Sequence, residues 1–254
     1  MEIYFLIVVC GVFAGFIGSL AGLGSAIGLY ALIDIVGMDA TIANGTNRLG
    51  ILAMSVMALP TFYKKGHLNL QKSKFVILAL FLGAIGGFYL AIYTDGQNIK
   101  NAFKYLLPVL LFIILFKPQK WTQGTDFSYN MNIWLSMPFF LMLGFYAGFI
   151  QVGTGVALVI FLSIFGRYSL VDATGVKLSA FALYTIVGLV IFTINEKIDW
   201  GYGILLASGQ GLGGYIAARV ATSYPHANSF VRYLLIIVLI IAIIRMFKFY
   251  ELLY

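Results

Sequence analysis

Hydrophobic residues run through the chain in long segments that short polar turns separate. The apolar runs lie at about 3–34, 42–63, 74–94, 102–116, 132–165, 170–194, 200–221 and 229–247. A membrane-spanning helix needs about 20 apolar residues, and most of these runs are of that order. The pattern therefore predicts an all-α, multi-pass protein with the lipid bilayer as its surroundings.

The longest hydrophilic connection lies near the middle of the chain, at residues 117–132, with four runs before it and four after it. Its glycine, proline and polar residues are typical of a boundary between two units. We expect a first transmembrane repeat at 1–116, a central connection at 117–131 and a second transmembrane repeat at 132–254.

The two halves repeat each other. GVFAGFI at 11–17 returns as GFYAGFI at 144–150, and KYLL at 104–107 returns as RYLL at 232–235. ANGTNRL at 43–49 likewise matches ATGVKLS at 173–179. An offset that stays near 130 residues indicates an internal duplication. Repeats of this kind are typical of transporters, whose substrate site lies between the two halves.

Glycines interrupt the first run of each half. Residues 3–34 would form a helix of about 48 Å, against a hydrocarbon core of about 30 Å. The stretch GSLAGLGSAIG at 18–28, with its counterpart QVGTGVA at 151–157, predicts a break. Each run is then either a kinked span or a re-entrant pair of half-helices. We favour the re-entrant form, which leaves three full spans per half and inverts the halves.

A break of this kind exposes amide N–H groups at the start of a half-helix, which favours an anion. The alternative for each glycine is packing, because Gly11 and Gly15, Gly144 and Gly148, and similar pairs have the spacing that lets helices approach closely. The recurrence of the break in both halves is what favours a site.

Two cations occupy matching places at the start of the next span: Arg48 in the first half and Lys177 in the second. A cation inside a membrane costs several kcal/mol unless it is paired or hydrated. Neither span contains an evident acidic partner, so a bound anion is one reason to retain these residues. The alternative is that both side chains snorkel to the headgroups.

The residues around the breaks and the cations are the candidate anion ligands. Arginine with threonine and asparagine side chains suits an oxoanion, because its planar fork can bind two oxygens. The candidates are Gly22, Gly24, Ser25, Asn44, Thr46, Asn47 and Arg48 in the first half, with Gln151, Gly153, Thr154, Gly155, Thr174, Lys177 and Ser179 in the second.

This order of motifs resembles the TauE/SafE sulfite exporter family. The first copy is GLGSAIGLYAL at 22–32 followed by ANGTN at 43–47, and the second is GTGVALVIFL at 153–162 followed by ATGVK at 173–177. Family members commonly show three consecutive glycines and a proline soon after, and this sequence has neither: Ser25 and Val156 stand where a glycine would be expected, and no proline occurs between Met1 and Leu59. The resemblance implies a secondary carrier that exports small sulfur-containing anions such as sulfite or sulfonates across the cell membrane.

Two other classes of function stay open at this point, a passive anion channel and a non-transporting membrane assembly factor. The sequence leaves the anion, the direction, the driving ion and the oligomeric state undetermined, and a homodimer is one such state. Charge counting places the basic segment at 64–74 in the cytoplasm, whether the first runs cross or re-enter.

Composition excludes a soluble domain, because hydrophobic residues make up 61%, charged residues 10%, and the mean hydropathy is +0.98. We assign the net charge of +7 to loop cations that face anionic lipid rather than nucleic acid. His67 and His226 lack metal-ligand spacing, and no serine has a nucleophile-elbow setting, so we expect no enzyme, cofactor or metal site. The carboxylates lie near run ends, and none indicates a buried proton relay.

Overall fold

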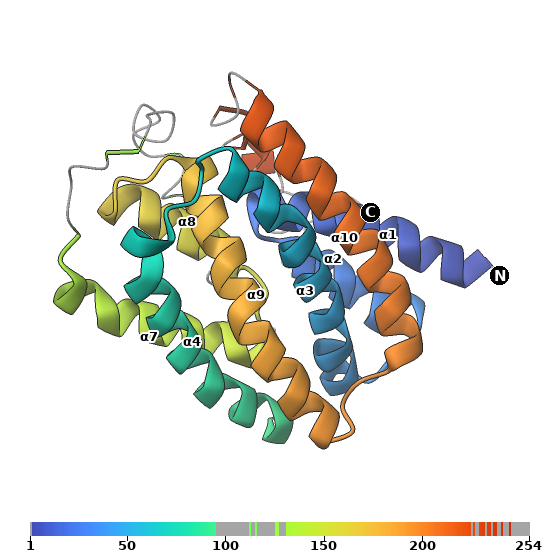
Figure 1. Ribbon diagram of the computed structural model, residues 1–254. Coiled ribbons are helices and arrows are strands. Elements are labelled where there is room, and N and C mark those ends of the chain that lie inside the picture. The colour runs from blue at the N-terminus through green and yellow to red at the C-terminus, as the bar shows by residue number, and fades with distance from the viewer. Residues whose placement is uncertain are drawn as a thin grey trace.

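The computed structural model describes residues 2–94 and 131–224, with scattered positions between 112 and 126 and between 226 and 244. This part of the chain is all-helical (Figure 1). The helices are α1 (Glu2–Ala21), α2 (Gly24–Tyr30), the π-helical η1 (Ala31–Ile35), α3 (Ala40–Lys64), α4 (Leu70–Tyr93), α7 (Ile133–Phe149), α8 (Thr154–Phe165), α9 (Leu170–Ile194) and α10 (Trp200–Ser223).

Six of the expected apolar runs correspond to these helices, and their ends agree within a few residues. The runs at 102–116 and 229–247 lie outside the described residues apart from scattered positions, as does nearly all of the expected connection at 117–131. The expected division into repeats therefore stays a prediction.

The breaks predicted in the first run of each half are confirmed. In the first half α1 ends at Ala21, Gly22 adopts a φ of +77°, and α2 begins two residues later. In the second half Gln151 and Gly153 have φ values of +60° and +78° between α7 and α8. Positive φ is ordinary for glycine but strained for glutamine, whose Cβ crowds the backbone.

After each break the chain folds back along the helix it has just left. A Cβ built on Gly24 would lie only 2.1 Å from the carbonyl oxygen of Ala14. Further along, Ile7 of α1 and Leu32 of η1 belong to one buried apolar cluster. Residues 2–35 therefore form a helical hairpin, which we call hairpin 1.

The second half contains the corresponding hairpin at residues 133–165, which we call hairpin 2. Near the start of α7, Phe139 stacks on Phe161 with their ring centroids 3.7 Å apart. Phe140 meets the same ring edge-on at 5.1 Å. Because Phe161 lies near the end of α8, the two helices run antiparallel.

The matching helices α3 and α9 run in opposite directions (Figure 1). Near the start of α3, a Cβ on Gly45 would lie 2.0 Å from the carbonyl oxygen of Lys197, which follows α9. Near the start of α9, a Cβ on Gly175 would lie 2.6 Å from the carbonyl oxygen of His67, which follows α3. Inverted halves require this arrangement.

Close glycine contacts join each hairpin to the other half. A Cβ on Gly213 would lie 2.0 Å from the carbonyl oxygen of Val12, which places α1 directly on α10. A Cβ on Gly148 would lie 2.1 Å from the carbonyl oxygen of Ala84, which places α7 directly on α4. The packing interpretation is therefore confirmed for these glycines.

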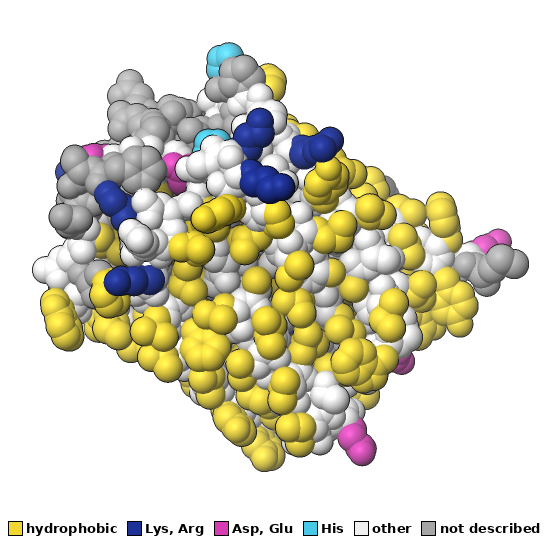
Figure 2. Space-filling view, viewed as in Figure 1, with side chains coloured by type: hydrophobic (Ala, Val, Ile, Leu, Met, Phe, Trp, Pro, Cys, Tyr) yellow, Lys and Arg dark blue, Asp and Glu magenta, His cyan; other side chains and the backbone are white. Residues whose placement is uncertain are grey.

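Helices α1, α4 and α9 are long and apolar enough to cross a membrane by length and composition. Helices α3 and α10, with 25 and 24 residues, are of similar length but less apolar. Their polar side chains, such as Asn47 and Gln210, are buried between helices. The outer face in Figure 2 is largely hydrophobic, as lipid contact requires.

Candidate functional site

The two glycine breaks, one from each half, lie against each other. A Cβ built on Gly22 would lie 2.4 Å from the carbonyl carbon of Gly155, and one built on Gly155 would lie 2.6 Å from the Cα of Gly22. The hydroxyl of Ser25 is 3.5 Å from the carbonyl oxygen of Gln151, to which it donates. We call residues 22–25 and 151–155 the hairpin tips.

Arg48 of α3 lies fully buried beside hairpin 2 and reaches the last turn of α7. Its Nη1 donates to Oε1 of Gln151 at 3.1 Å. Its Nη2 donates to the carbonyl oxygen of Gly148 at 2.6 Å and to Oδ1 of Asn44 at 3.4 Å. The carbonyl end of a helix carries partial negative charge, so this position suits a cation.

Aromatic rings and a tyrosine complete the surroundings of the guanidinium. Its central carbon lies 4.7 Å from the ring centre of Phe88 and 5.0 Å from that of Phe192. The contacts with both rings are cation–π interactions, which stabilise a desolvated charge. Gln151 is itself held, because its Nε2 donates to the hydroxyl of Tyr184 at 3.0 Å. Only Nε of Arg48 lacks a hydrogen-bond partner.

Lys177 of α9 is equally buried and reaches the last turn of α1 in the opposite half. Its Nζ donates to the carbonyl oxygens of Gly18 at 3.0 Å and Ser19 at 2.5 Å. Its stem passes hairpin 2, since a Cβ on Gly155 would lie 3.1 Å from Cδ of the lysine. Neither cation has any exposed surface, which contradicts the alternative that they snorkel.

Polar groups without partners lie at the start of α8 and in the last turn of α1. The hydroxyls of Thr154 in α8 and Ser19 in α1 are buried and make no hydrogen bond. The N-cap of α8, Gly153, offers no side-chain cap. Helices α3, α4, α9 and α10, by contrast, are each capped by a side chain at the residue before their start. Buried groups without partners are rare in proteins, so this tip has unused donors for a ligand.

Other predicted ligands make bonds elsewhere. Thr46 accepts the backbone N–H of Asp199 at 2.9 Å, in the connection before α10. The hydroxyls of Thr174 and Ser179 donate to carbonyl oxygens of their own helix, at 2.8 and 3.0 Å. Asn47 accepts a hydrogen bond from Gln210 at 3.1 Å. The structure thus places both cations and Asn44 beside the hairpin tips, where Gln151 also lies. The predicted ligands that bond to other partners are Thr46, Asn47, Thr174 and Ser179.

The glycines at the breaks have two different structural roles. Among the hairpin glycines, positive φ occurs at Gly22 and Gly153. Gly24 and Gly155 are instead constrained by close backbone contacts. The strained non-glycine at the break is Gln151, which is held in place by hydrogen bonds that include those with Ser25, Arg48 and Tyr184.

Sequence reasoning missed three aromatic residues around Arg48 and Gln151, and one amide beside Asn47. Phe88, Phe192 and Tyr184 look like ordinary apolar or aromatic members of spans, and their sequence positions carry no signal of contact with Arg48. Gln210 did offer a signal, as an amide inside the apolar stretch GQGLGG at 209–214. It is buried beside Asn47, and a Cβ on Gly50 would lie 2.5 Å from its Cδ.

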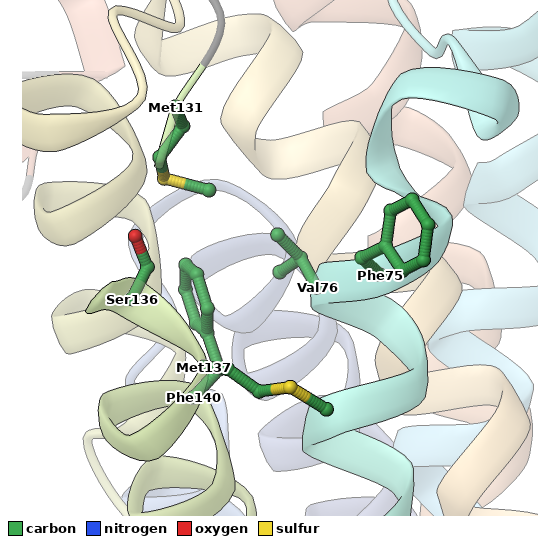
Figure 3. A pocket seen from close by; sticks show the side chains of 6 residues that line it. All are labelled: Phe75, Val76, Met131, Ser136, Met137 and Phe140. Carbon is green, nitrogen blue, oxygen red and sulfur yellow. The ribbon is translucent and has the colours of Figure 1, made fainter. Parts of the chain in front are cut away.

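A small pocket between α4 and α7 is a poor anion site. Its walls are almost entirely apolar, and its only hydroxyl donates to the carbonyl oxygen of Asn132 at 2.6 Å. Figure 3 shows its lining residues, which are Phe75, Val76, Met131, Ser136, Met137 and Phe140. None of these side chains carries a charge.

Comparison with known proteins identifies the family. The model of the family described as "Sulfite exporter TauE/SafE" matches residues 7–246. A "Probable membrane transporter protein ORF9" of Sinorhizobium sp is 28% identical over 246 residues, which cover 92% of this chain and 88% of that protein. A "Probable membrane transporter protein" of Haemophilus influenzae is 28% identical over 83% of this chain and 82% of its own.

A third relative, "Probable membrane transporter protein YfcA" of Escherichia coli K12, is 28% identical over 83% of this chain and 77% of its own. No solved structure matches the chain significantly. The family match covers almost the whole length, and both hairpins and all the helices described above lie within it or begin just before it. The chain is a membrane protein that belongs to the TauE/SafE sulfite exporter family.

Proposed function

We propose that this protein is a secondary transporter of small anions, with sulfur-containing oxoanions such as sulfite and sulfonates as its substrates and export as its direction. One observation carries the proposal: two fully buried cations, one from each half, lie beside the contact between two helix breaks without an acidic partner. In the described residues the ion pairs are His67 with Asp172 and Arg167 with Asp126, which involve neither cation. The relatives' names describe transporters, which supports a non-enzymatic role.

The anion binds at the hairpin tips in this proposal. The amides at the start of α8 and the unpartnered hydroxyl of Thr154 supply hydrogen-bond donors, and the buried cations supply charge. Helix starts and charged donors together are a favourable setting for an oxoanion. The fold agrees with this placement, because broken helices commonly meet at the substrate site of carriers with inverted repeats.

Release of the hairpins follows from the same contacts. Each cation holds the last turn of the first helix in the opposite half: Arg48 holds α7 and Lys177 holds α1. An arriving anion competes with these carbonyl oxygens for the cations. Because the tips touch mainly through glycine backbone, they can separate once the cations turn to the anion. Binding is thereby coupled to the opening that a carrier needs.

Charge at the two ends of the bundle supports one orientation in the cell membrane. Figure 2 shows the Lys and Arg of one face gathered toward the end where α3 ends and α4 begins. The exposed cations of that end are Lys64, Lys65, Lys72, Lys74, Arg167 and Arg219. The opposite end carries Asp34, Asp39, Glu196 and Asp199 with Lys197. The positive-inside rule places the basic end in the cytoplasm.

Flux into proteoliposomes tests the proposed function. Sulfite, sulfate, methanesulfonate and acetate are offered in turn, and we expect saturable uptake that prefers the sulfur oxoanions and accelerates when unlabelled anion is present inside. Uptake that rises linearly with concentration and ignores the opposite side would indicate a passive channel. Reconstituted protein that moves none of these anions would contradict transport and favour an assembly role.

A further inference from the structure

The two buried cations differ in their ability to lose a proton. The guanidinium of Arg48 stays protonated in proteins, whereas the amine of Lys177 can be neutral when it is buried. Arg48 has three acceptors and two aromatic faces around its charge. Lys177 has two carbonyl oxygens. The charge on the lysine is therefore the less compensated of the two.

The hydrogen bonds of Lys177 match a neutral amine. A neutral amine has two N–H donors and a lone pair, whereas an ammonium has three donors. The two bonds to Gly18 and Ser19 satisfy both donors of the neutral form. A fully buried ammonium without a counter-charge would be costly, because carbonyl dipoles replace only part of its hydration. The contacts in this structure thus suit a neutral lysine, whose Nζ carries two protons.

No described group near Lys177 provides a negative charge. On its own helix, Asp172 is bound by His67 and Thr125, and the neutral Tyr184 is bound by Gln151. Helix α8 carries no titratable side chain. The other titratable or charged groups on the helices around α9 are Glu2, Tyr4 and Cys10 on α1, Arg48, Tyr63 and Lys64 on α3, and Lys72, Lys74, Tyr89 and Tyr93 on α4.

We propose that Lys177 binds one proton together with each anion and releases both on the other side of the membrane, so that the protein couples anion transport to proton transport in the same direction. The inference rests on the proposed function and adds its coupling ion and the residue that carries it. The proton comes from water on the entry side and binds the lone pair of Nζ. It returns to water on the exit side when the anion leaves. A monoanion then crosses with no net charge, and export proceeds when the outward gradient of the anion exceeds the inward gradient of protons.

The structure explains why binding of the two is linked. The anion supplies the counter-charge that the buried ammonium lacks, so each favours binding of the other. The unpartnered hydroxyls of Ser19 and Thr154 are available to the anion, and the backbone carbonyl of Ser19 already contacts Nζ. Among the described residues no buried Asp, Glu or His offers a different carrier for the proton.

The test uses wild-type protein in proteoliposomes that contain a pH-sensitive dye, with methanesulfonate as the substrate. A sulfonate stays ionised at physiological pH, so any coupled proton must travel on the protein rather than on the substrate. We expect internal acidification of one proton per sulfonate taken up, and faster uptake when the outside is more acidic. Sulfonate uptake without proton movement would overturn the proposal and leave anion transport intact. If the protein moves no anion at all, the result contradicts the proposed transport function itself.

Two variants locate the proton on Lys177. Lys177→Arg keeps a cation that cannot release its proton, so the number of protons moved per sulfonate should fall at least tenfold, whatever the rate of sulfonate transport in this variant. Lys65→Arg, an exposed lysine after α3, is the matched control and should keep the wild-type ratio. A Lys177→Arg protein that moves protons as the wild type does would overturn the proposal. If that variant does not fold, the wild-type proton-to-sulfonate ratio still decides whether transport is coupled.

Discussion

The surroundings of Arg48 and Lys177 show how a duplicated scaffold can carry two different kinds of chemistry. Both residues lie in the first half of the helix that follows a hairpin, are fully buried, and donate to the last turn of a helix in the opposite half. Arg48 is enclosed by amide oxygens, a carbonyl and two aromatic rings. Lys177 has two carbonyls and lies next to hydroxyls without partners.

The different surroundings of the two cations indicate that the two halves have different functions. The permanent charge of Arg48 is built into the protein by contacts from α3, α4, α7 and α9 and fixes hairpin 2 in place. The charge of Lys177 depends on what binds beside it. Equivalent positions in two repeats therefore need not be equivalent in function, and the predictions below separate them.

Membrane topology should give the largest signal, because the result is all or none. The opposite directions of α3 and α9 and the basic end of the bundle place the segment at 64–74 in the cytoplasm. With the expected last span at 229–247, the C-terminus lies outside. We expect a periplasm-specific reporter fused to the C-terminus to be active, and a cytoplasm-specific one to be silent. The opposite result would contradict the inverted, re-entrant arrangement.

Substitution at the contact between the tips should have the next largest effect. Gly22→Val places a Cβ within 2.4 Å of backbone atoms at a φ of +77°. Overpacking costs about 1–3 kcal/mol and the strained conformation of order 1–3 kcal/mol more. We expect transport to be lost and the midpoint of thermal unfolding to fall markedly. Gly155→Val disturbs the same contact from hairpin 2, but Gly155 has no positive φ. Its effect on transport and on unfolding should therefore be smaller.

Gly37 supplies the matched control for the glycine prediction. Its φ of +80° equals the strain at Gly22, but nothing lies within 4 Å of an added Cβ. Gly37→Val should therefore be destabilised only by the backbone strain, and it should still transport the anion. If Gly22→Val behaves like Gly37→Val, the tips are not held in close contact.

Removal of Arg48 should weaken binding of the anion. Arg48→Met keeps the apolar stem and removes charge and donors worth roughly 1.5–3 kcal/mol, so apparent affinity should drop about tenfold or more. Arg48→Lys should keep part of the affinity for the anion, because lysine supplies the charge without the planar fork of the guanidinium. Transport is measured at sub-saturating anion and matched protein levels, with the exposed Arg219→Met as control. Equal transport by wild type and Arg48→Met would exclude the arginine from the site.

Stability should distinguish the two cations directly. Arg48→Met leaves acceptors on Gln151 and Gly148 unpaired and should lower the free energy of unfolding by about 1–3 kcal/mol. Lys177→Met removes two hydrogen bonds, but the carbonyl oxygen of Gly18 still accepts from the N–H of Gly22, so we expect a smaller loss. The midpoint of thermal unfolding in detergent measures both. Equal destabilisation would mean that both cations have the same structural role.

The smallest expected effect is at Thr154. Its buried hydroxyl has no partner in the closed structure, so Thr154→Val should leave stability unchanged or slightly raised. Loss of a donor to the anion should still reduce apparent affinity by several-fold, given about 1 kcal/mol per neutral hydrogen bond. Ser163→Ala on the same helix also removes an unpartnered hydroxyl, but away from the tip. Equal transport by both variants would place Thr154 outside the site.

Much of the fold could be predicted from local pattern. The apolar runs predicted the helices, because a segment in lipid must satisfy its own backbone hydrogen bonds and does so as a helix. The glycine stretches predicted both breaks, since positive φ favours glycine at Gly22 and Gly153, and close backbone approach favours it further at Gly22. The matching places of Arg48 and Lys177 were visible in the repeat.

Partners across the bundle could not be predicted, because they depend on which helices meet. Nothing local in the sequence indicates that Arg48 contacts α7 and two rings, or that Lys177 contacts α1. Gln151 was predicted as an anion ligand, and the structure gives it bonds to Arg48 and Tyr184. Thr46 was predicted in the same way and accepts a backbone N–H instead.

The sequence by itself determined an all-helical membrane protein with internal repeats, a glycine break in each half and cations at matching places, and it left open whether those cations are buried or snorkel. These features follow from hydrophobicity, glycine and charge at successive positions along the chain, which lipid and backbone sterics constrain locally. Only the tertiary structure decided that the breaks touch, that each cation binds the opposite half, and that their surroundings differ. Those contacts join residues a hundred or more positions apart, where the packing of whole helices, not the local pattern, fixes which groups meet.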